Sequence, residues 1–125
     1  MSILRSFQAE YQTQSPILLA LPVRNLIDEE VAHLLHILAS NATWHERKVA
    51  AQKLADLGGE EARIGLLEAL LNDPFWMVRC AIIQSLERIG EEGSVPVLQI
   101  AVESDPNEIV RQYAAVAVER LAIAG

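Results

Sequence analysis

An internal repeat constrains the fold of this 125-residue chain more than any other feature of its sequence. The sequence NDPFWMVR at residues 72–79 aligns with SDPNEIVR at residues 104–111, which places Arg79 and Arg111 32 residues apart. The same step backwards from Arg79 reaches Arg47. A fixed period of this length is typical of stacked units that bury their apolar faces only against their neighbours. The repeat therefore predicts about three units that share one register.

Each repeat contains two amphipathic helix patterns joined by a turn. In the central repeat, Val78, Ile82 and Leu86 recur four residues apart, as the buried stripe of a helix requires. Gly58 and Gly90 follow the last apolar residues of two such helices, where a left-handed C-terminal cap favours glycine. These patterns predict an all-α fold. The expected helices span residues 28–40, 42–57, 60–72, 74–89, 94–103 and 106–122.

The first 25 residues lie outside the repeat. Pro16 and Pro22 divide this segment, so we expect a short helix over residues 3–11 and another over residues 16–24. The expected organisation is an N-terminal helical or extended segment at 1–25 and a repeat domain at 26–125, with units of about 26–57, 58–89 and 90–122.

The repeated residues carry a family resemblance. Asp-Pro followed by Val-Arg, small residues and Leu-x-x-Ile-Gly resembles the HEAT repeat, in particular the short HEAT-like repeat of phycobilisome lyase proteins. The similarity covers about residues 26–122 and is clearest over residues 72–90; it is degenerate over residues 41–58, where Glu46 replaces the valine and Ala42 the proline. The resemblance implies helical hairpins stacked into a right-handed α-solenoid, with the second helices lining the concave face. Because this architecture has many functions, it implies the fold more strongly than the function.

Charged residues recur in register with the repeat. Arg47, Arg79 and Arg111 occupy one position in successive units, and Asp73 and Asp105 lie six residues before the last two arginines. A guanidinium there can bind a carboxylate or helix-end carbonyls of the neighbouring unit, which predicts a structural ladder. The alternative is a row of cations that binds an acidic partner.

The second helices also supply the candidate binding surface. If the apolar stripe faces inward, Cys80 and Ile83 face the groove, and Trp76 lies in the first turn, where tryptophan provides a large contact area. Simple packing between repeats is the alternative for Trp76 and Ile83. Cys80 is either a small buried hydrophobe or a reactive thiol whose thiolate Arg79 favours. The predicted partner-binding residues are Trp44, Trp76, Cys80, Ile83, Gln84 and Val116.

The last predicted helix is unusually apolar. Gln112, Glu119 and Arg120 are among its few polar residues, although the final helix of a solenoid usually faces water on its outer side. We therefore expect a second copy of the chain, an N-terminal segment of a neighbouring molecule or another partner to cover it. A homodimer through residues 106–123 is one such arrangement. Alternatively the helix stays uncovered, because ordinary protein surfaces are partly apolar.

Composition and charge exclude several function classes. Ten Lys and Arg against seventeen Asp and Glu give a net charge of −7, the wrong sign for binding a nucleic-acid backbone. No segment predicts insertion into a membrane, and one cysteine without a leader sequence favours the cytoplasm. His33 and His36 lie three residues apart but lack the further ligands that zinc needs, so we expect no metal and no cofactor.

No catalytic constellation is recognisable in the sequence, so the leading prediction is a non-catalytic interaction scaffold or adaptor. It would bind a protein partner through its concave face or its apolar terminal helix. The family resemblance implies an alternative, a subunit or accessory factor of a bilin lyase-type system with a phycobiliprotein as partner.

Overall fold

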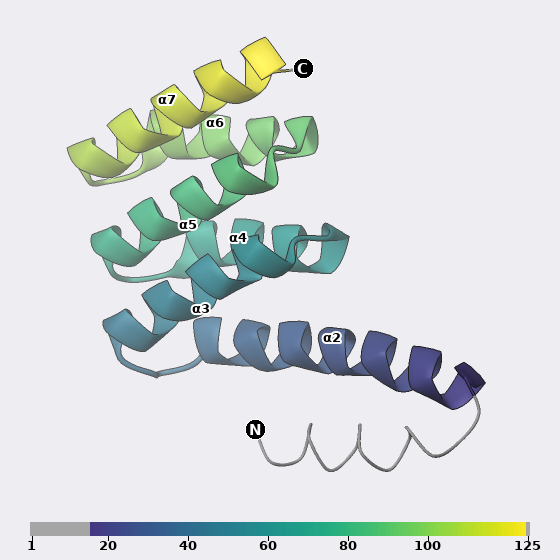
Figure 1. Cartoon of the computed structure of the whole chain (residues 1–125). Coiled ribbons are helices and arrows are strands. Elements are labelled where there is room, and N and C mark those ends of the chain that lie inside the picture. Colours follow the sequence, from purple (N-terminus) through teal and green to yellow (C-terminus); the bar gives the residue numbers. More distant parts are fainter. Residues whose placement is uncertain (1–15, 125) are drawn as a thin grey trace. The chain divides into compact units, whose positions relative to one another are not determined.

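The computed structural model describes residues 16–124, which form α-helices and one short 3₁₀ turn, with no β-strand in that range (Figure 1). The elements are α2 (Pro16–Leu38), α3 (Trp44–Leu57), α4 (Glu60–Asn72), α5 (Trp76–Ile89), the 3₁₀ turn η1 (Glu92–Ser94), α6 (Val95–Ser104) and α7 (Glu108–Ala124). The predicted all-α class is confirmed.

The chain divides into two compact units, residues 1–30 and 31–125. The described part of the first unit is the beginning of α2, which runs unbroken through Pro22. The prediction of a separate helix over residues 16–24 is therefore wrong. Proline has a helical φ, so a helix can continue through it, although it loses one backbone hydrogen bond and its ring crowds the carbonyl four residues earlier. The helix predicted over residues 3–11 lies outside the described residues.

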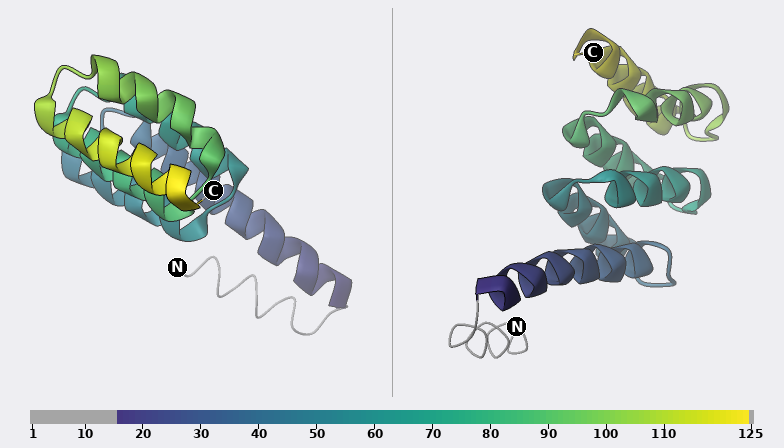
Figure 2. Two further views of the ribbon diagram at one scale, coloured as in Figure 1. Left: turned by 90° about the horizontal axis from the view of Figure 1, so that it is seen from above. Right: turned by 90° about the vertical axis from the view of Figure 1, so that its right-hand side faces the viewer.

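Within residues 31–125 the helices stack as hairpins, in the manner of a HEAT solenoid. Helix α4 packs against α5, and α6 packs against α7. The second helices α3, α5 and α7 lie side by side in one row (Figures 1 and 2). The interior of this stack consists of aliphatic side chains with no exposed surface, among them Leu54, Leu66, Ile82, Leu86 and Leu98.

An aspartate fixes the turn before each of the last two second helices. The Asp73 carboxylate accepts a hydrogen bond from the Phe75 N–H at 3.0 Å, and the Asp105 carboxylate accepts one from the Asn107 N–H at 2.9 Å. The proline that follows each aspartate belongs to this turn. As a result α5 and α7 each begin two residues later than the sequence predicts.

Glycine ends the second helices in two different ways. Gly90 caps α5 in the left-handed conformation, with φ 78° and ψ 19°, and its N–H donates to the Leu86 carbonyl at 3.1 Å. Gly58 also has a positive φ, 68°, but its ψ of −162° leads the chain out in an extended direction. The predicted left-handed cap is therefore present at Gly90, whereas Gly58 has a different geometry.

Candidate functional site

A ladder of buried ion pairs joins successive repeats. The Arg47 Nε and Nη2 donate to the two Asp73 carboxylate oxygens at 2.8 and 3.1 Å, and Arg79 makes the same fork to Asp105 at 2.8 and 3.0 Å. These four side chains are at most 11% exposed. Two parallel charge-assisted bonds fix both the distance and the orientation of neighbouring units. Arg47 and Arg79 are thus enclosed within the stack and do not present a cationic row to a partner.

A groove of about 830 Å³ lies along the second helices, mainly between α5 and α7. It is open to solvent, and Gln52 of α3 contributes to one edge. The residues that line it are Gln52, Ala81, Gln84, Ser85, Glu87, Arg88, Gln112, Tyr113, Val116 and Arg120. This volume lies within the range of sites that bind small molecules or peptide side chains.

The two walls of the groove differ in polarity. The α7 wall carries Tyr113 and Val116, which are 39% and 42% exposed, between the polar Gln112 and Arg120, and Ile109 and Ile123 extend the apolar face of α7. We call Ile109, Tyr113, Val116 and Ile123 the apolar ridge; their spacing of four, three and seven residues keeps them on one helical face. On α5 the wall is polar, with Gln84 exposed. A surface with one apolar and one polar side matches an amphipathic ligand.

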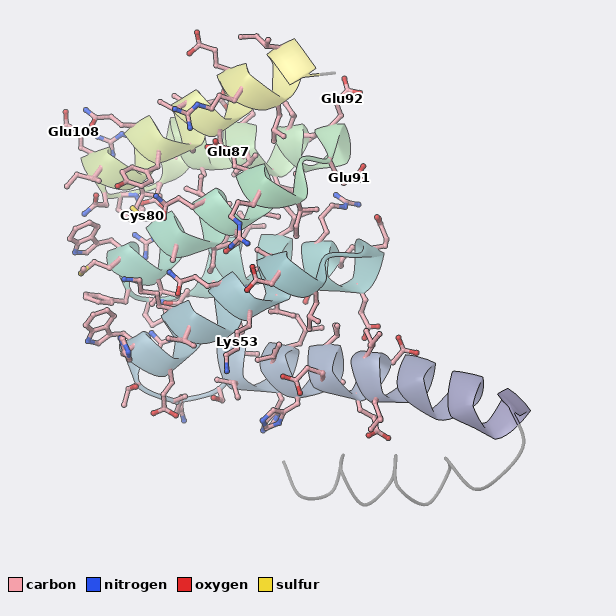
Figure 3. The ribbon with its side chains drawn as sticks, viewed as in Figure 1. Lys53, Cys80, Glu87, Glu91, Glu92 and Glu108 are labelled. Atoms are coloured by element: carbon pink, nitrogen blue, oxygen red, sulfur yellow. The ribbon has the colours of Figure 1, made fainter. Side chains whose placement is uncertain are left out.

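Ion pairs cross between helices at the edge of the groove. The Arg120 Nη1 donates to a Glu87 carboxylate oxygen at 2.8 Å and so joins α7 to α5. Arg88 pairs with Asp56 and joins α5 to α3. Figure 3 shows Glu87 on the side of α5 that faces α7. Arg88, Asp56 and Arg120 are more than half exposed and Glu87 is 21% exposed, so these pairs orient the helices more than they stabilise them.

An aromatic cluster lies where α3 and α5 begin. The Trp44 and Phe75 rings are 5.3 Å apart in an edge arrangement, and the Phe75 and Trp76 rings are 6.3 Å apart. Trp44 is 40% exposed, whereas Trp76 is half-buried. Trp76 therefore packs within this cluster and also retains some accessible surface, which combines the two alternatives that the sequence left open.

Two predicted groove residues are buried instead. Ile83 has no exposed surface and Cys80 is 8% exposed, so the prediction that both face the groove is wrong. The physical reason is that α5 has neighbours on three sides. Positions 80 and 83 lie on its side toward α7, where Figure 3 shows Cys80. A helical pattern with one buried stripe and one free face does not include the contact of α5 with α7.

The environment of the Cys80 thiol opposes the reactive role. Burial raises its pKa above the ordinary value, the nearby Asp105 carboxylate raises that pKa further, and the Arg79 cation lowers it by a smaller amount. The neutral thiol is therefore favoured at neutral pH. Cys80 serves as a small packed side chain between α5 and α7.

The remaining predicted residues lie at the surface, and several groove residues are absent from the prediction. Gln84 and Val116 line the groove, whereas Trp44 belongs to the aromatic cluster. Tyr113 and Arg88 are the main groove residues that the sequence reading missed. The repeat register contains the signal for Tyr113, because its counterpart one repeat earlier is the small residue Ala81.

The histidines and the longer helices give no further site. Among the described residues, no three His, Cys, Asp or Glu side chains lie together in a way that would hold a metal ion. In residues 16–124 no helix combines the length and the hydropathy needed to cross a bilayer.

Comparison with known proteins agrees with this architecture. The family model for HEAT repeats matches residues 31–119, which include the aromatic cluster, the ladder and all groove residues except Arg120. A search of curated proteins finds no significant match. The match is to HEAT repeats in general, so the finer resemblance to phycobilisome lyase proteins stays a prediction. The chain belongs to the HEAT repeat family.

Proposed function

We propose that this chain is an interaction scaffold that binds an amphipathic helix of a partner protein in the groove between α5 and α7. HEAT repeats commonly serve as protein–protein interaction scaffolds. The observation that carries the proposal is the apolar ridge of Ile109, Tyr113, Val116 and Ile123, which remains exposed beside a groove of about 830 Å³.

The chemistry of the groove favours a helix as the ligand. Tyr113 and Val116 follow Ile109 at four and seven residues, the spacing at which side chains of one helix interdigitate with those of another. The facing amide of Gln84 and the Glu87–Arg120 pair form a polar edge. A bound helix would place its apolar side on the α7 ridge and its polar side along α5. Tyr113 is the expected anchor, because tyrosine combines a large apolar area with a hydroxyl group.

A pair of matched variants tests this proposal. Val116→Asp places a carboxylate on the apolar ridge, and Ile64→Asp places one at a similarly exposed position on α4, away from the groove; the two native side chains are 42% and 45% exposed. The native chain and both variants are used to capture proteins from a lysate of the source cells. Cross-linking mass spectrometry then maps where each captured protein contacts the chain.

The expected result is a protein that the native chain and Ile64→Asp retain, that Val116→Asp loses, and that cross-links to α5 and α7. The helix mapped in that protein is then made as a synthetic peptide, and titration calorimetry measures its affinity for this chain. The Tyr113→Ala variant should bind the peptide at least tenfold more weakly than the native chain, as expected for an anchor residue. A partner that all three chains retain equally, or one that cross-links only to α4 and α6, would refute binding in the groove.

The sequence resemblance leaves the bilin lyase-type alternative to be tested separately. A bilin is added to the chain, with and without a phycobiliprotein acceptor, and the absorption spectrum is recorded. A shifted band would support an accessory role in that system, whereas an unchanged band would contradict it. Because this test does not involve the groove variants, its result is independent of theirs.

A further inference from the structure

The three ladder arginines make one common contact and differ in a second. In each case Nη1 donates to a backbone carbonyl just before its own helix; for Arg79 the acceptor is Asp73 at 2.9 Å, and for Arg111 it is Asp105 at 2.7 Å. In Arg47 and Arg79 the remaining Nε and Nη2 form the fork to an aspartate of the following repeat. The common contact fixes the direction in which each fork points.

The fork of Arg111 has no carboxylate in the described chain. Its Nη1 bond shows that the guanidinium is oriented like that of Arg79, so its Nε and Nη2 point to where the aspartate of a following repeat would lie. Among residues 16–124, no hydrogen bond or ion pair uses these two nitrogens. Arg111 is half-buried, which means that the fork is oriented by the protein and still accessible. The geometry therefore leaves a site for one carboxylate at this end of the stack.

The surface of α7 around this fork can be identified by comparing the repeats. In α5 the residues that face α7 include Cys80, Ile83 and Glu87, which are buried or half-buried. Their counterparts in α7, one repeat later, are all exposed. This surface, the end ridge, consists of Glu108, Gln112, Ala115 and Glu119, of which Gln112 also borders the groove. The large exposed apolar residues of α7, Ile109, Tyr113, Val116 and Ile123, lie instead on the groove side.

The end ridge supplies the carboxylate that the fork requires. Arg111 and Glu119 lie four residues before and four residues after Ala115, about 6 Å along the helix in each direction. A separation of four residues keeps all three on one face. If two copies of α7 pack antiparallel across a two-fold axis at Ala115, Arg111 of each copy lies opposite Glu119 of the other. The small side chain of Ala115 allows close approach of the helices at the axis.

We propose that the end ridge is a self-association surface, on which the open fork of Arg111 binds Glu119 of a second copy of this chain. A two-fold axis makes the contact occur twice, as an isologous interface requires. Charge complementarity and the orientation that Asp105 imposes on Arg111 support this interface, and neither involves the apolar ridge on which a partner helix would bind. Its failure and the failure of the proposed function are therefore distinguishable.

Charge reversal on the full chain tests the proposal. Sedimentation equilibrium measures the association at about 0.15 M salt. At this salt concentration the Debye length is about 8 Å, which limits the mutual repulsion of two chains that each carry −7. The native chain should show a concentration-dependent rise from 13.8 kDa toward twice that mass. Arg111→Glu and Glu119→Arg should each weaken association at least tenfold, because each places like charges opposite one another. The double reversal should restore it.

Matched controls keep the test decisive. Lys53→Glu reverses an exposed charge on α3, a helix away from the end ridge, and should leave association unchanged. Arg111→Gln, which retains a donor for the Asp105 carbonyl, replaces Arg111→Glu if circular dichroism shows that the reversal unfolds the chain. A monomer at all concentrations, an association that ignores both reversals, or single losses that the double reversal does not rescue would each overturn the proposal. A monomer whose Arg111 variants instead lose a captured protein would assign the fork to another partner.

Discussion

At the scale of single residues, the chain uses two kinds of ion pair for different purposes. Arg79 and Asp105 are enclosed, with side chains 10% and 7% exposed, whereas Arg88 and Asp56 are more than half exposed. An enclosed charge loses its hydration on folding and depends on its partner, so removing one member leaves the other charge buried without compensation. In an exposed pair, water hydrates the remaining charge when its partner is removed, so the loss changes the free energy of unfolding little. The two arginines of α5 therefore form a natural comparison.

We predict that Arg79→Gln lowers the free energy of unfolding by about 3 to 5 kcal/mol, the usual cost of leaving a buried charge unpaired. Arg88→Gln, on the same helix, should change it far less. Urea unfolding followed by circular dichroism measures both. Equal midpoints for the two variants would show that the buried ladder does not stabilise the stack.

At the scale of elements, the sequence predicts where each helix lies better than it predicts what packs against each side of the helix. The apolar spacing of Val78, Ile82 and Leu86 was sufficient to place α5, because one buried stripe defines an amphipathic helix. It was not sufficient for Ile83, whose burial depends on α7, a helix that packs on it from the next repeat. The same position is exposed as Ala115 in α7. Local periodicity is enough to predict where the helices lie. The residues of the candidate site depend in addition on which helices pack against each other, and local periodicity does not contain that information.

Helix ends offer a prediction at this same scale. Gly90→Ala should lower the free energy of unfolding by about 1 to 2 kcal/mol, because a Cβ is disfavoured at a left-handed φ of 78°. Gly93→Ala is the matched control, since its φ is not positive and its added Cβ would meet only the Arg63 guanidinium at 3.4 Å. Thermal unfolding of both variants measures the difference. A neutral Gly90→Ala would contradict a role for the cap.

At the scale of the whole molecule, contacts connect each repeat of residues 31–125 mainly with its neighbours. Helix α5 packs against α3, α4 and α7, whereas the end ridge of α7 has no described helix against it. Stability in such arrays is approximately a sum of unit and interface contributions. Local unfolding is therefore expected to need less free energy at α7 than at α5, which has more neighbouring helices among the described residues.

Native-state hydrogen exchange should reveal this gradient. The backbone amides of α5 are expected to exchange more slowly than the equivalent amides of α7, since opening α5 disrupts two interfaces between second helices and opening α7 disrupts one. Mass spectrometry of peptides from each helix measures the two rates. Identical protection in both helices would indicate that residues 31–125 open only as one unit.

The direction of the arginine–aspartate ladder has a consequence for how such a chain can grow. Every rung joins an arginine to an aspartate of the following repeat, and each 32-residue unit that begins near Gly58 or Gly90 carries one of each. Duplication of one complete unit in the gene would therefore add a matched rung and leave no buried charge unpaired. A partial duplication that copies an arginine without its aspartate would leave one of these charges without its partner. The ladder thus makes whole-repeat duplication the tolerated route to a longer protein.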